Sequence, residues 1–310
     1  MAFLEIDHVT KHFPNPDGKG TLCVFREVAF GIERGEFLTM VGHSGCGKST
    51  LLNIIAGLET SSQGGVVLEG REIRGPGMDR MVVFQNFSLM PWMTAFENIR
   101  LAVRAAYPSW SRQQVRKYVQ RYVDMVGLTG AERKRPTALS GGMRQRVGLA
   151  RAFATEPKVL LLDEPFAQID ALTRGVIQEE LIRMWAETRT TVFMVTHDVD
   201  EAILLSDRIL LMTRGPDAEL AGAVAVDIPR PRTREAIIEH PRYYPIRNHI
   251  LHFLTGQSRR TDPSPDHQAT SALRAAAGAP NGNGTGAPAA PHSKAYTISQ
   301  GTVHSEEGRG

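Results

Sequence analysis

The sequence FLTMVGHSGCGKSTLLNIIAGL at residues 37–58 contains a glycine loop between two apolar runs. Its central part, GHSGCGKST at 42–50, matches the pattern G-x-x-x-x-G-K-[ST] in full. The apolar run Phe37–Val41 before it predicts a buried strand, and the run after it predicts a helix. In this context the glycines let backbone N–H groups turn towards phosphate oxygens. The pattern therefore predicts a phosphate-binding loop, in which Lys48 meets the β- and γ-phosphates and Ser49 offers its hydroxyl to Mg²⁺.

The two cysteines, Cys23 and Cys46, carry little functional information. They have no metal-binding spacing and form no disulfide framework, which is typical of a reducing cytoplasm. Cys46 lies inside the glycine loop and has two interpretations. It is a small residue that fills a gap, which is the favoured one, or a reactive thiol beside bound phosphate.

Composition excludes some classes of function for this chain of 310 residues. The net charge of +3 is too small to argue for a nucleic-acid partner. No apolar run approaches the roughly 20 residues that are needed to span a bilayer. The start, MAFLEIDHVT, alternates apolar and polar residues and predicts a first strand, not a signal peptide. Any work at a membrane must therefore pass through another subunit.

Short apolar runs recur between polar segments through the first 257 residues, as is typical of a globular domain. Runs at residues 81–84, 159–162 and 192–195 resemble the one before the glycine loop. Continuous apolar runs are typical of strands in a sheet that is covered on both faces. Helical runs lie between some of them, which favours an α/β fold with parallel strands.

Two segments lack these strand-like apolar runs. Between about 88 and 157 there is no strand signal, and Ser111 is placed to cap an amphipathic helix. Its apolar stripe consists of Val115, Tyr118, Val119, Tyr122, Val123 and Val126. An all-helical insertion is therefore expected over 88–157. Residues 258–310 are rich in Ala, Gly, Pro, Ser and Asn, and this composition predicts a disordered tail.

Polar residues follow two of the predicted strands. KVLLLDEP at 158–165 ends in Asp163 and Glu164, and VFMVT is followed by His197. The carboxyl ends of parallel strands meet at one edge of the sheet, where ligands of α/β proteins bind. Asp163 is placed there to hold Mg²⁺ and Glu164 to polarise a water. A lone histidine is more often structural than catalytic, but His197 follows a strand that is predicted to lie beside that of Asp163, so its ring could reach a γ-phosphate.

A second glycine loop, LSGGMRQR at 139–146, also begins a helix. Ser140 can cap that helix, and the two glycines allow close approach of a ligand. Because the helical insertion separates this loop from the first one, a single chain would have difficulty closing both on one nucleotide. A two-fold dimer, in which each loop meets the nucleotide of the other copy, removes the difficulty.

Together, GHSGCGKST, Gln85, LSGGM, VLLLDEP and His197 occur in an order that resembles the nucleotide-binding subunit of an ABC transporter, over about residues 3–255. The resemblance implies a P-loop ATPase core with an N-terminal antiparallel β part and the inserted helical subdomain. It implies ATP and Mg²⁺ as cofactors and ATP hydrolysis as the activity. The residues implied to bind nucleotide are Phe13, Gly42, His43, Ser44, Gly45, Cys46, Gly47, Lys48, Ser49, Thr50, Ser140, Gly141, Gly142 and Asp170. Those implied to act in catalysis are Glu164, His197, Gln85 and Lys48, and those near magnesium are Ser49, Gln85 and Asp163.

This sequence departs from the family pattern at two places. Met143 stands where the signature loop usually has Gln, which predicts retained function with altered contacts to the nucleotide sugar. The segment before Asp170 reads Ala-Gln-Ile-Asp where Ala-Leu-Asp is usual, so the packing around Gln168 is expected to differ.

The segment FQNFSLMPWMTAFENI at 84–99 is expected to receive another chain near Leu89, Trp92 and Met93. Adaptable Met with Trp suits a docking groove, while the alternative is plain core of the helical insertion. The resemblance implies docking of two membrane permease subunits, a second ATP-binding subunit in a homo- or heterodimer, and a periplasmic or lipid-anchored solute-binding protein. It places the chain peripherally on the cytoplasmic face of the inner membrane and implies no nucleic-acid partner.

Finer resemblance points to the nitrate/nitrite branch of importers. It rests on GPGMDRMVVFQNFSLMPWMTAFENI and on IPRPRTREAIIEHPRYYPIRNHILHFL. Sulfonate, taurine and cyanate import stay open as alternatives. A soluble ABC-type ATPase of DNA repair or translation is a more distant one, since this chain has neither a long coiled-coil insertion nor a second cassette. A P-loop kinase or switch GTPase would lack the LSGG loop and His197.

Overall fold

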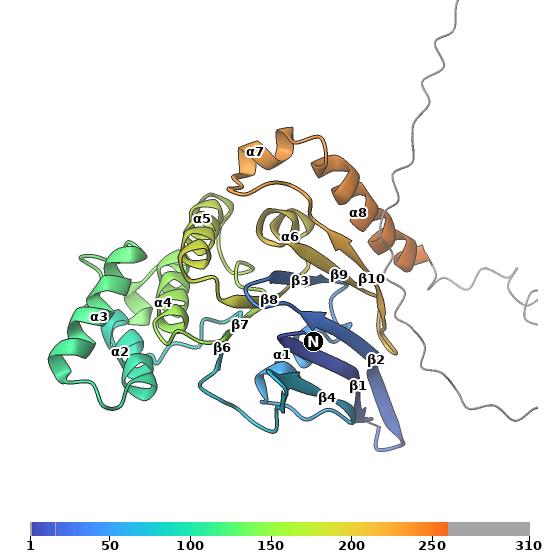
Figure 1. Cartoon of the computed structure of the whole chain (residues 1–310), viewed down its shortest axis with the longest axis horizontal. Coiled ribbons are helices and arrows are strands. Elements are labelled where there is room, and N and C mark those ends of the chain that lie inside the picture. Colours follow the sequence, from blue (N-terminus) through green and yellow to red (C-terminus); the bar gives the residue numbers. More distant parts are fainter. Residues whose placement is uncertain (1, 16, 260–310) are drawn as a thin grey trace, which may run out of the picture.

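Two β-sheets pack on a shared core around helix α1 in the computed structural model, which describes residues 2–15 and 17–259 (Figure 1). The predicted tail over 258–310 lies outside the described residues, except that residues 258 and 259 end the last helix.

The first sheet is antiparallel, with the strand order β2-β1-β4-β5. Its strands are β1 (Leu4–Pro14), β2 (Thr21–Ile32), β4 (Gln63–Leu68) and β5 (Arg71–Glu72). This sheet confirms the antiparallel N-terminal part that the family resemblance implies.

The second sheet has the order β10-β9-β3-β8-β7-β6, and only the edge strand β10 runs antiparallel to its neighbour. Its strands are β3 (Phe37–Val41), β6 (Arg80–Val83), β7 (Val159–Asp163), β8 (Thr191–Thr196), β9 (Arg208–Met212) and β10 (Leu220–Ala225). Each of the predicted apolar runs forms a strand here. Strand β8 lies between β3 and β7, so the strands that precede the glycine loop, His197 and Asp163 are neighbours.

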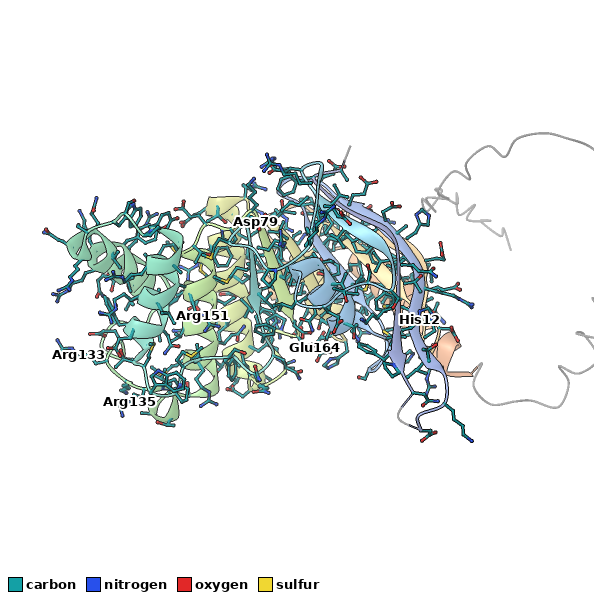
Figure 2. The ribbon with its side chains drawn as sticks, turned by 90° about the horizontal axis from the view of Figure 1, so that it is seen from below. His12, Asp79, Arg133, Arg135, Arg151 and Glu164 are labelled. Atoms are coloured by element: carbon teal, nitrogen blue, oxygen red, sulfur yellow. The ribbon has the colours of Figure 1, made fainter. Side chains whose placement is uncertain are left out.

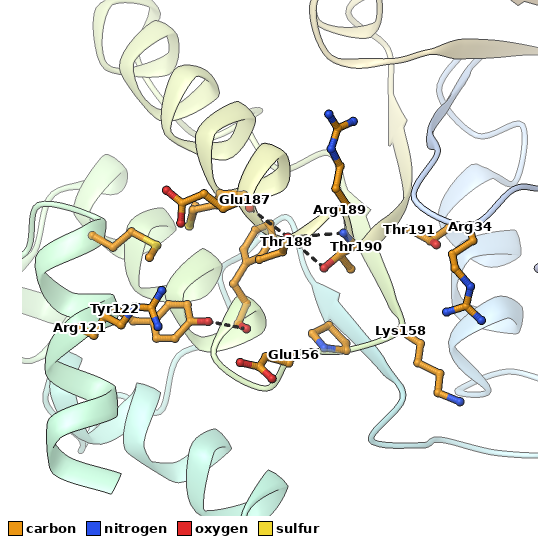
Figure 3. Close-up of a pocket in the computed structure, with 14 residues that line it drawn as sticks. Arg34, Arg121, Tyr122, Glu156, Lys158, Glu187, Thr188, Arg189, Thr190 and Thr191 are labelled. Atoms are coloured by element: carbon orange, nitrogen blue, oxygen red, sulfur yellow. Dashed lines mark hydrogen bonds between the residues drawn. The ribbon is translucent and has the colours of Figure 1, made fainter. Parts of the chain in front are cut away.

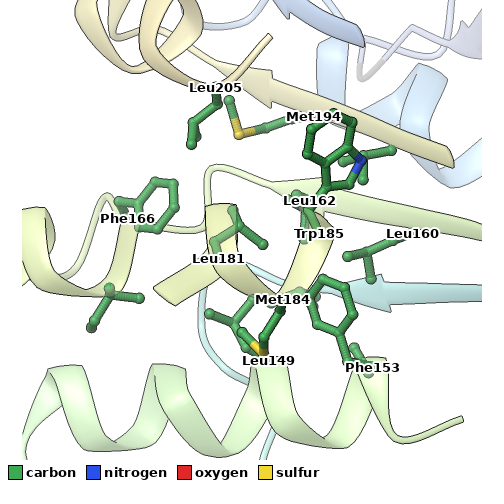
Figure 4. Close-up of a cluster of buried hydrophobic side chains, with 14 of the residues drawn as sticks. Leu149, Phe153, Leu160, Leu162, Phe166, Leu181, Met184, Trp185, Met194 and Leu205 are labelled. Carbon is green, nitrogen blue, oxygen red and sulfur yellow. The ribbon is translucent and has the colours of Figure 1, made fainter. Parts of the chain in front are cut away.

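The central strands β3, β7, β8 and β9 are buried on both faces, as continuous apolar runs predict, whereas the edge strands β6 and β10 are partly exposed. In β7, Leu161 faces a core shared with α1 and the antiparallel sheet, whereas Leu160 and Leu162 face the opposite core. Figure 4 shows that opposite core, where α4 contributes Leu149 and Phe153 and α5 contributes Trp185. Burying each such large apolar side chain contributes roughly 1.5–3 kcal/mol. Helices α1 and α4 therefore lie on opposite faces of the sheet.

The insertion between β6 and β7 holds only helices, as predicted. They are α2 (Ala95–Ala106), α3 (Arg112–Met125), the 3₁₀ turn η1 (Pro136–Ala138) and α4 (Gly141–Phe153). The remaining helices are α1 (Lys48–Ala56), α5 (Ala171–Thr188), α6 (Val199–Leu205), α7 (Arg234–Glu239) and α8 (Tyr243–Arg259). Ser111 caps α3 in a reciprocal capping box with Gln114, which confirms the predicted start of that helix.

Candidate active site

The first glycine loop connects β3 directly to α1, in the strand–loop–helix order that the sequence predicts. Gly47 precedes α1 with φ of 98°, a conformation that favours glycine. A Cβ atom there would also lie 2.7 Å from the side chains of Val24 and Phe25. The loop can therefore keep its shape only with glycine at this position.

Lys48 curls back into the loop from the first turn of α1. Its buried ammonium group donates hydrogen bonds to the carbonyl oxygens of Gly42 at 2.9 Å and His43 at 3.0 Å. The loop thus holds a positive charge beside the N–H groups of a helix N-terminus, and both features favour an anion.

Cys46 is fully buried within the same loop. Burial raises the pKa of its thiol, which keeps the thiol protonated and weakly nucleophilic. A Cβ atom on Gly42 would lie 3.0 Å from the Cys46 sulfur, so the thiol fills the space next to that glycine. Both observations favour the gap-filling interpretation.

Ser49 and Asp163 meet at the end of β7. The Ser49 hydroxyl donates a hydrogen bond of 2.7 Å to the Asp163 carboxylate, although the two residues are far apart in the sequence. Burial raises the pKa of Asp163, and the hydrogen bond from Ser49 opposes that effect. A hydroxyl and a carboxylate side by side are oxygen donors of the kind that Mg²⁺ takes, so this pair fits the ion.

Glu164 and His197 also meet at this edge. Strands β7 and β8 pair in parallel with Asp163 opposite Val195, as the interpretation of His197 requires. Glu164 continues the ladder through its N–H, which donates to the Val195 carbonyl at 3.0 Å. Its carboxylate then lies 3.2 Å from His197 Nδ1. Glu164 is 17% exposed and His197 56% exposed, so the pair is accessible from one side. Figure 2 shows Glu164 between the helical insertion and the antiparallel sheet.

A buried hydrogen-bond network supports the loop that carries His197. The Thr196 hydroxyl donates to Glu201 at 3.0 Å, and the Gln178 side-chain amide donates to the same carboxylate at 3.2 Å. Glu201 is 4% exposed, and burial raises its pKa to about 7. Asp198 caps α6 by accepting from the Glu201 N–H at 3.1 Å. Sequence reasoning missed this network, because a glutamate in the first turn of a helix usually lies in solvent.

Gln85 is exposed and follows β6, which pairs with β7. It therefore belongs to the same edge of the sheet as Asp163, Glu164 and His197. Phe13 is half-buried in β1, where it pairs with Leu22, and the Lys11 ammonium lies 4.6 Å from the centre of its ring. None of these contacts joins Phe13 to the glycine loop, and its contact with adenine stays a prediction.

His43 gives the glycine loop a second support. Its Nε2 donates a hydrogen bond of 2.9 Å to the Leu254 carbonyl oxygen of α8. Ser44 and Gly45 are exposed at the loop surface, and Thr50 is half-buried in the first turn of α1.

The second glycine loop lies elsewhere. Ser140 caps α4, as predicted, and its hydroxyl oxygen accepts from the Met143 N–H at 3.2 Å. A Cβ atom on Gly141 would lie 3.1 Å from the Gln168 carbonyl oxygen, and one on Gly142 would lie 2.3 Å from the Thr173 methyl group. This loop therefore packs on the segment that leads into α5, where Asp170 is the N-cap residue. It shares no face of the sheet with the first loop.

A cavity of about 520 Å³ lies at the opposite end of the parallel strands (Figure 3). Lys158, directly before β7, and Thr191, the first residue of β8, are among its lining residues, together with Arg34, Arg121 and Arg189. Arg34 and Lys158 are already paired with Glu69. None of the predicted site residues lines this cavity, so the site at the carboxyl edge is separate from it.

Known proteins resemble this chain in sequence and in structure. A family model described as ABC transporter matches residues 25–167. The nitrate import ATP-binding protein NrtC of Synechocystis is 51% identical over 84% of this chain, which spans only 38% of that protein's length. NrtD of Synechococcus elongatus, also named a nitrate import ATP-binding protein, is 50% identical, with 82% of this chain and 92% of that protein covered.

The bicarbonate transport ATP-binding protein CmpD of Synechococcus elongatus is 48% identical, with 84% of this chain and 93% of that protein covered. The dimeric structure of the ATP-binding cassette MJ0796, in a post-hydrolysis state with ADP and Pi, has a TM-score of 0.65 at 31% identity. It covers 73% of this chain and 99% of its own.

Proposed function

The chain belongs to the ABC transporter family of ATP-binding subunits, and we propose that it hydrolyses ATP to power the import of a small anion. One observation carries the proposal: the glycine loop, Asp163, Glu164 and His197 meet at one edge of a parallel sheet. The relatives supply the direction and the class of cargo, since those described above are named for nitrate import and bicarbonate transport.

The residues at this edge have distinct roles in the proposed reaction. The loop N–H groups and Lys48 bind the β- and γ-phosphates. Ser49 and Asp163 would hold magnesium, with Gln85 near it, and the bound ion would neutralise phosphate charge. Glu164 orients the attacking water in line with the γ-phosphate, and His197 stabilises the charge that develops on it.

Two copies are needed to complete each site. Helices α1 and α4 lie on opposite faces of the sheet, so Ser140, Gly141 and Gly142 do not reach the nucleotide held by their own chain. In a two-fold dimer they close on the nucleotide of the other copy, and Asp170 lies at the same interface. The partner is a second copy of this chain or a related ATP-binding subunit, and the similar cassette MJ0796 was solved as a dimer.

The conformational change that accompanies ATP hydrolysis would be transmitted to another protein through a surface that contains Leu89, Trp92 and Met93. Trp92 is 65% exposed, although it belongs to a loop that hydrogen bonds tie to helix α2. Fully buried Asn98 holds that loop, accepting from the Met90 N–H at 2.8 Å and donating to the Thr94 carbonyl at 2.9 Å. A large apolar ring on a fixed loop suits docking of another protein.

We assign this surface to a membrane permease subunit, two of which would complete the transporter. Among the described residues, no helix is both long and apolar enough to cross a bilayer. The chain would then sit on the cytoplasmic face of the membrane, and a solute-binding protein would deliver the cargo from the other side. Replacing Trp92 and Met93 by Ala should release it from membranes and leave its basal ATP hydrolysis intact; unchanged membrane association would contradict this role.

Nitrate is the cargo that we favour, and bicarbonate is the second candidate. Both are planar oxyanions with one negative charge, and the relatives named for them are similarly close to this chain. The sequence patterns leave sulfonate, taurine and cyanate open as well, whereas bicarbonate is indicated only by the relatives.

Uptake of isotope-labelled nitrate tests the proposal. Cells that lack their own copy of the gene receive either the intact chain or its Glu164→Gln variant, with excess bicarbonate, cyanate or taurine as competitors. Rescue by the intact chain alone, insensitive to competitors, supports nitrate import. If the chain hydrolyses ATP but does not rescue nitrate uptake, its cargo is one of the other candidates. If the purified chain has no ATPase activity, the proposed ATP hydrolysis is wrong.

A further inference from the structure

The turn that follows Gln85 has a strained backbone. Phe87 and Ser88 have φ angles of 62° and 44°, in the left-handed region that residues with a Cβ atom rarely adopt. Two such residues in succession persist only where the surrounding structure fixes them.

Arg151 of α4 supplies that constraint. Its guanidinium group donates hydrogen bonds to the Ser88 carbonyl at 2.7 Å and to the Phe87 carbonyl at 3.2 Å. The planar fork of arginine suits two adjacent acceptors. Burial lowers the pKa of Arg151, and no carboxylate in the described part of the chain forms an ion pair with it. Its charge is therefore committed to these two carbonyl groups.

Other residues of α4 contact the same turn. The Arg144 guanidinium lies 5.3 Å from the centre of the buried Phe87 ring. A Cβ atom on Gly148 would be 4.0 Å from the Phe87 carbonyl oxygen, so the helix backbone passes close to the turn. Figure 2 shows Arg151 within the helical part of the molecule. The turn after Gln85 is thus attached to the helix that begins at the second glycine loop.

We propose that Arg151 is a positioning residue, which holds the turn after Gln85 in its left-handed shape and thereby sets how Gln85 meets magnesium and the γ-phosphate. Arg151 acts through the Phe87 and Ser88 carbonyl groups and does not touch the nucleotide itself. The proposal rests on the proposed function for the role of Gln85. It has the further consequence that Gln85 moves only together with α4.

The first test needs no nucleotide. In the Arg151→Ala variant, hydrogen exchange of the amides over residues 85–89 should accelerate about tenfold or more, because the turn opens without its support. Arg146→Ala is the matched control, since this arginine of α4 bonds instead to Glu180 and to the Gly127 carbonyl. Equal exchange over 85–89 in both variants and the unaltered chain would overturn the proposal.

The second test measures hydrolysis against magnesium concentration at saturating ATP. Arg151→Ala should raise the half-saturating magnesium concentration roughly tenfold, since a small displacement of a positioned group costs this much or more. Binding of a fluorescent ATP analogue without magnesium should stay within about twofold of the unaltered chain. Arg146→Ala should lower the melting temperature but leave the magnesium dependence unchanged.

Restoration distinguishes positioning from mere loss of packing. Arg151→Lys keeps a cation beside the two carbonyls, and Ser88→Gly lets the backbone adopt positive φ unaided. Ser88→Gly combined with Arg151→Ala should return the half-saturating magnesium to within about threefold of the unaltered chain, whereas Arg151→Lys alone, which keeps the charge but not the planar fork, should restore it only in part. If neither variant restored the magnesium dependence, the proposal would be overturned. An unaltered chain without ATPase activity would instead contradict the proposed function, and the exchange measurement would still decide the role of Arg151.

Discussion

Glu164 Oε2 lies 3.2 Å from His197 Nδ1, although the two residues are 33 positions apart in the sequence. The contact follows from the sheet order, because β7 and β8 are parallel neighbours and both residues come directly after their strands. Glu164 takes a left-handed φ of 44°, which turns its side chain out of the ladder. A carboxylate and an imidazole are thus fixed together beside the phosphate-binding loop.

Replacing Glu164 by Gln should slow ATP hydrolysis by at least about a hundredfold, because the amide cannot orient and polarise water as the carboxylate does. ATP binding should be retained, since Glu164 is not needed to hold the phosphates. Phosphate release and binding of a fluorescent nucleotide measure the two effects. The Glu187→Gln variant, at the opposite end of the strands, is the control and should hydrolyse ATP normally. Hydrolysis at more than a tenth of the normal rate in Glu164→Gln would contradict the assigned role.

Substitution of Gly142 by Ala should destabilise the fold by roughly 1–3 kcal/mol, because the new methyl group would overlap the Thr173 methyl group 2.3 Å away. Thr173→Ser removes that methyl and should restore most of the lost stability in the double variant. Thermal unfolding of the single and double variants measures this. If the double variant melts no higher than Gly142→Ala alone, the contact with Thr173 does not explain the need for glycine.

Stability should fall as the pH rises from about 4.5 to about 7, through the buried carboxyl of Glu201. Burial raises its pKa to about 7, so the folded chain holds this proton over a pH range in which the unfolded chain has lost it. The folded state is therefore favoured on the acidic side of this range.

The Glu201→Gln variant should lose this pH dependence of stability, because the glutamine side chain is neutral at every pH. The free energy of unfolding in urea, measured from pH 5 to pH 8, should fall more steeply in the unaltered chain than in the variant, by on the order of 1–3 kcal/mol. Parallel curves for the two proteins would show that Glu201 does not titrate in this range.

Cys46 should resist alkylation in the folded protein at neutral pH, because it is buried and burial raises its pKa. Iodoacetamide should modify it at least about a hundredfold more slowly than in the urea-unfolded chain, with or without ATP. Mass spectrometry of the labelled peptides follows Cys23 and Cys46 separately. Fast labelling of Cys46 that ATP suppresses would restore the reactive-thiol interpretation.

Local patterns predict much of this architecture. The run Phe37–Val41 and the loop after it can be read directly, since a buried strand, a glycine turn and an apolar helix each leave a local signal. The start of α3 at Ser111 is equally clear from its capping residue. Parallel winding predicts that the strands of Asp163 and His197 are neighbours, and the pairing of β7 with β8 confirms it.

Other features depend on contacts between distant segments and leave no local signal. In β2 the exposed residues Arg26 and Glu27 interrupt the apolar pattern, and the pairing with β1 shifts register on both sides of them. Nothing near Arg151 in the sequence indicates that it bonds the carbonyls of Phe87 and Ser88. Burial of Glu201 likewise arises only when α5 and β8 come together.

The hydrogen bond from His43 to the Leu254 carbonyl oxygen joins α8 to the glycine loop that is proposed to bind the ATP phosphates. If breaking this hydrogen bond weakens nucleotide binding, thermodynamic reciprocity requires that bound nucleotide also strengthens the contact between His43 and α8. A tether, tag or additional domain joined beyond residue 259 would then change nucleotide binding at the first glycine loop.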